Sequence, residues 1–416
     1  MKLATPSTPQ SKLAIHGGKP LIARPAPSPK RWGDPEREQL SKMIEQRSLF
    51  YWKGPQTTLL VERFREQYPL QHVFPCSSGT AAIHIAVAAA GVGPGDEVIT
   101  TPITDMGTVI GILYQQAVPV FADLEPHTYN LDPADVRKKI TSKTKAILLV
   151  HLAGNPCNLE AFRTLAEQHN LVLIEDCAQA WGAKYRGRAV GTIGHIGCYS
   201  LNDFKHIGCG DGGIVASNDE RFGPLLQKFG DKAYDRSGGA RSPDVLAANY
   251  RISEPQSAVA AAQMLRLEDI VVARTKIGTL LSDRLEKIPG IHIHQVDPQD
   301  RCTFWFYWLR IDPSSFRCSR DEFVDALSAE GVPAWPGYIP TPVYQYPIFQ
   351  NHNFFAGRWP VRELGLTDMD YTKVRCAEAE AILADGVRMP INEAMDEAWI
   401  EDVAAAIQKV AAHFAG

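Results

Sequence analysis

The chain has 416 residues, of which 45% are hydrophobic and 22% are charged, and its formal net charge is −4. This length allows two domains, and the slightly acidic charge argues against nucleic acid or an anionic membrane as a partner. No apolar run approaches the roughly 18 residues of a membrane-spanning helix, so we expect no membrane partner.

The N-terminus and the cysteines indicate a cytoplasmic protein. Residues 1–30 begin without the apolar core of a secretion signal, and we interpret them as a leader or arm. The eight cysteines are scattered and none forms Cys-x-x-Cys, which is typical of reduced thiols in a cytoplasmic enzyme. The pairs His195/Cys198 and His206/Cys209 are only a weak zinc signal, so we expect no metal.

From about residue 71, short β-rich runs alternate with helical stretches. Several runs are apolar on both faces, a pattern typical of a mainly parallel sheet that helices cover on both sides. Ligands collect at the carboxyl ends of such strands, where His151 and Asp176 stand. The predicted strands are 96–101, 119–123, 144–151, 171–176 and 212–217, and the predicted helices are 80–91, 105–115, 132–140 and 159–169.

The last third of the sequence has a different pattern. Segment 255–288 is predicted to be helical and to lead out of the large domain. Residues 302–312 are predicted to form an aromatic strand, 320–330 a helix, and 395–415 a terminal amphipathic helix. These elements indicate a second, smaller α+β domain.

The domain limits follow from these elements. We expect a large domain over 31–265 and a small C-terminal domain over 266–416. Residues 333–372 are rich in Pro, Tyr and Trp, and we predict an ordered loop region near a ligand or an interface.

Small polar residues open the helix predicted at 80–91. Ser78, Gly79 and Thr80 would present hydroxyls and free backbone N–H groups, which together form a ready phosphate site. The alternative interpretation is an ordinary helix cap. Ser200 could supply a further hydroxyl to the same phosphate.

An acid and a lysine carry the strongest chemical signal. Asp176 ends a predicted strand, and Lys205 follows in a turn rich in Ser and Gly. A lysine amine can hold the aldehyde of pyridoxal phosphate (PLP) as a Schiff base, while a carboxylate keeps the pyridine nitrogen protonated. Gln179 could share a helical face with Asp176 and reach the ring oxygen. Each residue alone could be a cap or a solvated side chain, but together they predict a PLP-dependent aminotransferase with PLP in the domain 31–265.

These segments resemble the DegT/StrS family of sugar aminotransferases. The similarity runs from Leu13 to the final helix and includes Ser-Ser-Gly-Thr-Ala-Ala, Glu-Asp-Cys-Ala-Gln-Ala and Asn249-Tyr-Arg-Ile-Ser-Glu. It implies the fold-type I architecture of PLP-dependent transferases, an α/β fold with a mainly parallel sheet between helices and a smaller C-terminal α+β domain. It also implies that Lys205 bonds to PLP, Asp176 pairs with the pyridine nitrogen and Gln179 touches the ring.

The resemblance extends to the phosphate and to a second subunit. It assigns Gly79, Thr80 and Ser200 to the phosphate, and it implies that Asn249 reaches the phosphate in the neighbouring subunit of a homodimer with shared active sites. The family usually has an aromatic residue stacked on PLP where this chain has Met106. Met106 could pack there through its polarizable sulfur.

The implied reaction moves an amino group from glutamate or glutamine to a keto group of a nucleotide-linked sugar or of an inosose-like cyclitol. A PLP-dependent lyase acting on a sugar or a cyclic amino ketone is an alternative. A PLP-binding regulatory protein is another, but the sequence has no basic DNA-binding segment. Six aromatic residues could stack on a sugar or a base, or could simply pack in the core: Tyr51, Trp52, Trp305, Tyr307, Trp335 and Tyr338.

Overall fold

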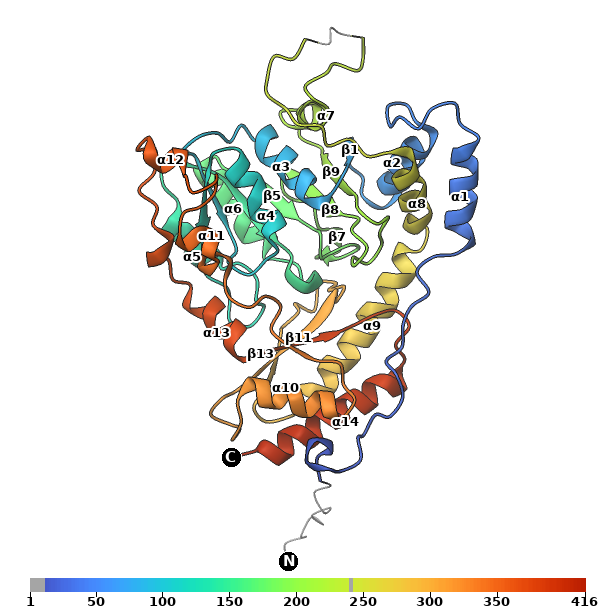
Figure 1. Cartoon of the computed structure of the whole chain (residues 1–416), viewed down its shortest axis with the longest axis vertical. Helices are drawn as coiled ribbons and strands as arrows, with labels where there is room; N and C mark the ends of the chain where they lie inside the picture. Colours follow the sequence, from blue (N-terminus) through green and yellow to red (C-terminus); the bar gives the residue numbers. More distant parts are fainter. Residues whose placement is uncertain (1–11, 239–241) are drawn as a thin grey trace, which may run out of the picture.

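The computed structural model describes residues 12–238 and 242–416, so residues 1–11 of the predicted arm lie outside the described residues. Within the described residues, a seven-stranded sheet and a four-stranded sheet form the centres of two parts of the molecule (Figure 1). The small sheet and its helices occupy the lower end in this view, where the chain also ends.

The large sheet has the strand order β1-β9-β8-β5-β4-β2-β3. Among its described strands, β9 is the one that runs against its neighbours, because both of its pairings are antiparallel and all other pairings are parallel. The predicted mainly parallel α/β fold is therefore confirmed. The strands are β1 (His72–Cys76), β2 (Glu97–Thr100), β3 (Val118–Phe121), β4 (Thr144–Val150), β5 (Val172–Asp176), β8 (Ile196–Ser200) and β9 (Gly213–Ser217).

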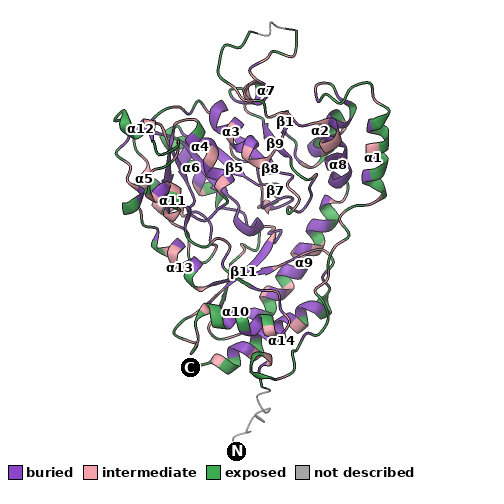
Figure 2. Ribbon diagram, in the orientation of Figure 1, coloured by how far each residue is buried: buried purple, intermediate pink, exposed green. Residues whose placement is uncertain are grey.

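Helices cover both faces of this sheet. Cys198 and Tyr199 are consecutive residues of β8, so their side chains point to opposite faces. The Cys198 thiol donates to the carbonyl oxygen of Ala82 in α3 at 3.5 Å. The Tyr199 ring packs edge-on against Phe64 and Tyr68 on the other face, near the C-terminal end of α2. Figure 2 shows the strands buried between these layers. The helices of this part are α1 (Asp34–Ile44), α2 (Pro55–Gln67), α3 (Gly79–Ala89), α4 (Met106–Tyr114), α5 (Pro133–Lys139), α6 (Leu159–His169), α7 (Gly223–Gly230) and α8 (Glu254–Met264).

Each strand and helix predicted between residues 80 and 217 is present near its predicted bounds. The predicted helical segment 255–288 is divided into α8 and α9 (Leu267–Leu285). The division lies at Arg266, whose guanidinium binds the Glu36 carboxylate and the carbonyl oxygen of Arg31. A two-stranded hairpin, β6 (Lys184–Tyr185) and β7 (Arg188–Ala189), follows β5.

The small sheet is antiparallel, with the order β10-β11-β13-β12. Helices α9, α10 and α14 pack around it (Figure 1). Strand β11 lies within the aromatic run predicted at 302–312, and the loop region 333–372 contains only short elements among its described residues. The elements are β10 (Ile291–Ile293), β11 (Phe306–Ile311), α10 (Arg320–Ala329), β12 (Trp335–Pro336), α11 (Pro347–Gln350), α12 (Pro360–Glu363), α13 (Ala377–Asp385), β13 (Gly386–Pro390) and α14 (Glu397–Phe414), with 3-10 turns η1 (Ala14–His16), η2 (Leu152–Gly154), η3 (Val343–Gln345) and η4 (Tyr371–Lys373).

Buried apolar side chains of the described residues form two clusters. The first fills the large sheet and its helices, and it also takes in Tyr344 and Tyr371. The second lies around the small sheet and contains Leu13 and Ile22 of the N-terminal arm. The domain limits at 30/31 and 265/266 remain a prediction. None of the described helices is both long and apolar enough to cross a membrane.

Glu254 joins α8 to the start of α2. Its buried carboxylate accepts hydrogen bonds from the backbone N–H groups of Gln56 and Thr57, each at 2.9 Å, and from the Thr57 hydroxyl at 2.6 Å. These are N–H groups that the first turn of a helix leaves without a partner. The carboxylate fits because residue 54 is glycine, since a Cβ there would overlap the Glu254 carboxylate.

Replacing Glu254 by Ala leaves two buried backbone N–H groups without an acceptor, whereas the Thr57 hydroxyl can still donate to Ser257 Oγ at 2.9 Å, so we expect the free energy of unfolding to fall by about 2 kcal/mol or more. Urea unfolding followed by circular dichroism measures this loss. Glu397→Ala is the control, because its exposed ion pair with Lys276 should contribute less than about 1 kcal/mol. Equal losses in the two variants would contradict a capping role for Glu254.

Candidate active site

A polar cavity of about 230 Å³ opens at the carboxyl ends of β5 and β8. The start of α3, the segment around the start of α4 and the turn after β8 complete its walls. The cavity brings together seven of the nine residues that the sequence analysis selected: Ser78, Gly79, Thr80, Asp176, Gln179, Ser200 and Lys205.

The start of α3 forms a narrow cradle at one end of the cavity. Ser78 is the N-cap of this helix, and its Oγ accepts a hydrogen bond from the backbone N–H of Ala81 at 3.0 Å. Ser78 can therefore act both as a helix cap and as part of a phosphate site, because its hydroxyl hydrogen can still be donated to a ligand. Gly79 must lack a side chain, since a Cβ there would lie 2.7 Å from the Cβ of Ser200.

Asp176 lies buried at the end of β5. Its Oδ1 accepts from the backbone N–H of Ala178 at 3.0 Å, and its Oδ2 accepts from the Thr108 hydroxyl at 2.9 Å. Burial raises the pKa of Asp176 above its usual range, whereas these two hydrogen bonds favour the charged form. The sequence analysis missed Thr108. A signal for it was the spacing of Thr104 and Thr108, which lie four residues apart on either side of the start of α4 and whose hydroxyls are 2.7 Å apart.

Lys205 is half-buried, and its amine points into the same cavity. Burial lowers the pKa of Lys205 to about 8, although the charges of Asp176 and Asp105 act in the opposite direction. The amine nitrogen lies over the Trp305 ring, 3.7 Å from the ring centroid. A lysine with this pKa offers far more neutral, nucleophilic amine at neutral pH than an ordinary lysine does.

Gln179 connects the cavity to the aromatic residues of the small part. Its Oε1 accepts from the backbone N–H of Ala153 at 2.9 Å, and its Nε2 donates to the Tyr338 hydroxyl at 3.4 Å. Tyr338 in turn packs edge-on against Trp305, so these two of the six candidate aromatics lie beside the cavity. The other four have different partners: Tyr51 hydrogen-bonds Asp231, Trp52 packs against Tyr51, Tyr307 hydrogen-bonds Ser282, and Trp335 lies against Arg388.

Met106 and Asn249 do not line this cavity. Met106 is the first residue of α4, is half-buried and packs against the first hydrophobic cluster. Asn249 is exposed, and its Oδ1 accepts from Arg251 Nε at 2.7 Å. It stands at the base of the segment 231–249, whose described parts project from the top of the molecule in Figure 1. The proposed contacts of these two residues with the cofactor remain predictions.

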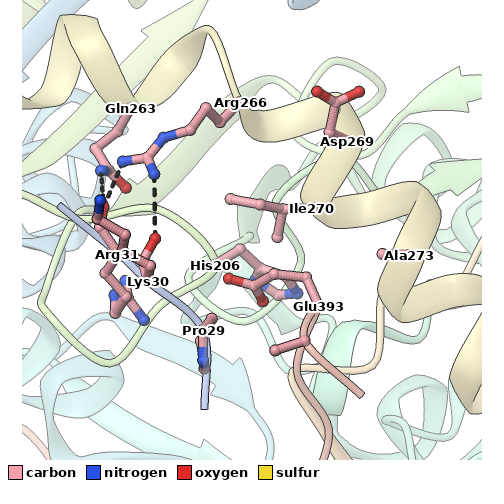
Figure 3. A pocket seen from close by; sticks show the side chains of 11 residues that line it. Pro29, Lys30, Arg31, His206, Gln263, Arg266, Asp269, Ile270, Ala273 and Glu393 are labelled. Atoms are coloured by element: carbon pink, nitrogen blue, oxygen red, sulfur yellow. Dashed lines mark hydrogen bonds between the residues drawn. The ribbon is translucent and has the colours of Figure 1, made fainter. Parts of the chain in front are cut away.

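A second cavity, of about 330 Å³, lies behind the turn that carries Lys205 (Figure 3). Arg31, the residue that follows the predicted arm, lines it and donates from Nη2 to the carbonyl oxygen of Lys205 at 2.8 Å. His206 also faces this cavity, and its Nε2 donates to the carbonyl oxygen of Thr303 at 3.0 Å. Arg31 and the small part of the molecule therefore both hold the lysine turn from behind.

His151, Glu175 and Cys177 form a buried group beneath the cavity. His151 Nε2 lies 3.0 Å from Glu175 Oε2, and its Nδ1 accepts from the backbone N–H of Cys157 at 3.0 Å. Burial alone would raise the pKa of Glu175, but the hydrogen bonds from His151 and from the backbone of residues 191–194 hold it below its usual value. Because the buried polar atoms of His151 and Glu175 have hydrogen-bond partners within the protein, this group serves to fix the end of β5 that carries Asp176.

The fold and the cavity can be compared with known proteins. The model of the DegT/DnrJ/EryC1/StrS aminotransferase family matches residues 33–408. The chain belongs to this family. The resemblance noted from the sequence and the expected enzyme class, an aminotransferase, are thereby confirmed.

Individual relatives differ in their substrates. The chain is 34% identical over 401 residues to a protein of Micromonospora echinospora that is provisionally named L-glutamine:3-amino-2,3-dideoxy-scyllo-inosose aminotransferase, covering 94% of this chain and 91% of that protein. It is 30% identical to the GDP-perosamine synthase of Caulobacter vibrioides, covering 83% and 88%. Among solved structures, 3-amino-5-hydroxybenzoic acid synthase superposes with a TM-score of 0.82 at 25% identity, covering 94% and 99%.

The charge balance around Lys205 can be measured in the cofactor-free protein. We expect the reaction of Lys205 with acetic anhydride, followed by peptide mass spectrometry, to have its midpoint near pH 8. Asp176→Asn removes a negative charge that raises the pKa of Lys205, so the midpoint should move to lower pH. Asp269→Asn, in the cavity behind the turn, is the control and should leave it unchanged. A midpoint near 10.5 in the unmodified protein would refute this account of the site.

Proposed function

We propose that the protein is a PLP-dependent aminotransferase that moves an amino group from glutamate or glutamine onto a keto group of a nucleotide-linked sugar or of an inosose-like cyclitol. One observation carries the proposal. A lysine amine, with a pKa lowered by burial, shares a small cavity with a buried carboxylate and with the start of a helix.

The residues of the cavity fit PLP group by group. PLP has an aldehyde for Lys205, a ring nitrogen for Asp176, and a phosphate for the cradle at the start of α3. Because residue 79 is glycine, the start of α3 can approach the Ser200 side chain closely, so that backbone N–H groups and the Ser200 hydroxyl lie together at this cradle. When bound, PLP supplies an electron sink for the substrate carbon.

The side chains of the cavity then have separate tasks. Lys205, while its amine is free, takes a proton from the substrate carbon and returns it, and a pKa near 8 makes both directions accessible. Asp176 would keep the ring nitrogen of the bound cofactor protonated, because its buried carboxylate places a negative charge in the cavity, where an opposite charge is strongly attracted. Gln179 is oriented by the backbone N–H of Ala153 and is in place to touch the ring.

The acceptor is proposed as a polyhydroxylated ring. Trp305 and Tyr338 present aromatic surface beside the cavity, on which the apolar face of a sugar or cyclitol can pack. The names of the two relatives compared above include both a cyclitol and a nucleotide-linked sugar, and we keep both acceptor classes in the proposal.

Nitrogen-15 transfer tests the reaction. We expect the purified protein, supplied with PLP, to move label from glutamate or glutamine into one member of a panel of keto sugars and inososes. Lys205→Arg keeps the positive charge but cannot release a free amine at neutral pH, so turnover should fall by a factor of about 10³ or more. Lys276→Ala, at an exposed ion pair, is the control with unchanged turnover. Product that lacks labelled nitrogen would instead indicate a lyase.

We further propose that the protein is a cytoplasmic homodimer with shared active sites. The described parts of segment 231–249 project from the molecule, and Leu246 among them is 95% exposed, which favours burial of this surface against a partner. Asn249 lies outside the cavity of its own chain and is available to a second one. All eight cysteines are free thiols, as expected in a reducing compartment.

Mixed dimers test the shared site. Asn249→Asp would place a negative charge beside the phosphate, and we expect it to inactivate the enzyme, as Lys205→Ala does. In a mixed dimer of the two variants, one site carries both substitutions and the other carries neither. Unfolding and refolding the variants together should therefore restore about a quarter of the original activity, as an isologous dimer requires. No recovery, despite dimers by light scattering, would contradict a shared site.

A further inference from the structure

The free amine of Lys205 has an unusual partner. We propose that the face of the Trp305 ring binds the protonated amine of Lys205 and thereby extends the pH range over which Lys205 can act as a proton donor. Trp305 is thus a positioning residue that acts through Lys205, and its effect on turnover rests on the role proposed for Lys205 above.

The geometry is that of a cation–π contact. The amine nitrogen lies 3.7 Å from the centroid of the Trp305 ring, well inside the roughly 6 Å over which an ammonium is attracted to an aromatic face. Within the described residues, the Lys205 amine forms neither a hydrogen bond nor an ion pair with any oxygen. The ring is therefore the group that holds the amine in place.

The ring is itself fixed to the lysine turn. Its indole N–H donates to the carbonyl oxygen of Phe204 at 2.7 Å, and Phe204 directly precedes Lys205. The backbone N–H of Trp305 donates to Ala153 at 2.9 Å, and Tyr338 packs edge-on against the ring at 5.8 Å. The indole is thus anchored to the same turn that carries the amine.

Other charges around Lys205 act from further away. Asp176 at the end of β5 and Asp105 at the start of α4 favour the protonated amine, and Asp211 also lines the cavity. Behind the turn, Arg31 binds the backbone of Lys205, and His206 is neutral because burial lowers its pKa. These groups do not contact the Lys205 amine, whereas the Trp305 ring does.

The sign of a pKa change separates two roles for Trp305. If the ring only shields the amine from water, the smaller Leu side chain leaves the pKa of Lys205 unchanged or raises it, because water enters. If the ring face binds the ammonium, Leu lowers the pKa of Lys205. A contact of this kind corresponds to a decrease of about 0.4 to 1.5 pKa units.

The experiment measures the midpoint of Lys205 acetylation against pH in the full-length, cofactor-free protein and in three variants. We expect Trp305→Leu to shift the midpoint below that of the unmodified protein, and Trp305→Phe, which keeps an aromatic face, to fall between the two. Trp335→Leu is the control, because Trp335 contacts Arg388 and not the cavity. Circular dichroism confirms that each variant is folded.

Three results would overturn the proposal. They are an unchanged midpoint in Trp305→Leu, a raised midpoint in the same variant, and an equal decrease in the Leu and Phe variants. The last result would assign the effect to the lost indole N–H bond to Phe204 rather than to the ring face. Because the measurement needs neither PLP nor substrate, failure of nitrogen transfer would refute the proposed function without touching this result.

Discussion

The site depends on one electrostatic constraint, the burial of an amine to which no oxygen of the described residues bonds directly. Desolvation disfavours the charged form of Lys205. More of its amine is therefore neutral and nucleophilic at neutral pH than in an exposed lysine. The charges of Asp176 and Asp105 limit the effect. The pKa of about 8 is the balance between these opposing contributions.

The fold holds the groups that set the pKa of Lys205 in fixed positions. Parallel strands β5 and β8 end at the same edge of the sheet, so Asp176 and the turn that follows Ser200 face one cavity. The buried hydrogen bond between His151 and Glu175 fixes β5 from below, while Arg31 holds the lysine turn from behind. The pKa of Lys205 depends on this support, because small shifts of Asp176 or of the lysine turn would change the electrostatic environment of the amine.

The sequence predicted much of the large part, because strands buried on both faces appear as continuous apolar runs that end in polar residues such as Asp176. It did not predict β1 or β8. Strand β1 contains Pro75, and β8 reads Ile-Gly-Cys-Tyr-Ser, so pairing with neighbouring strands and not local preference determines them. The contact between Lys205 and Trp305 joins residues far apart in the chain, and no spacing rule indicates such a pair.

Trapping the bond to Lys205 tests the central claim most directly. The protein is incubated with PLP, reduced with sodium borohydride and digested, and the peptides are analysed by mass spectrometry. We predict one stoichiometric phosphopyridoxyl group, carried by Lys205, and its loss when Lys205 is replaced by Ala. A group carried by another lysine, or no group at all under conditions in which the protein is folded, would contradict the account.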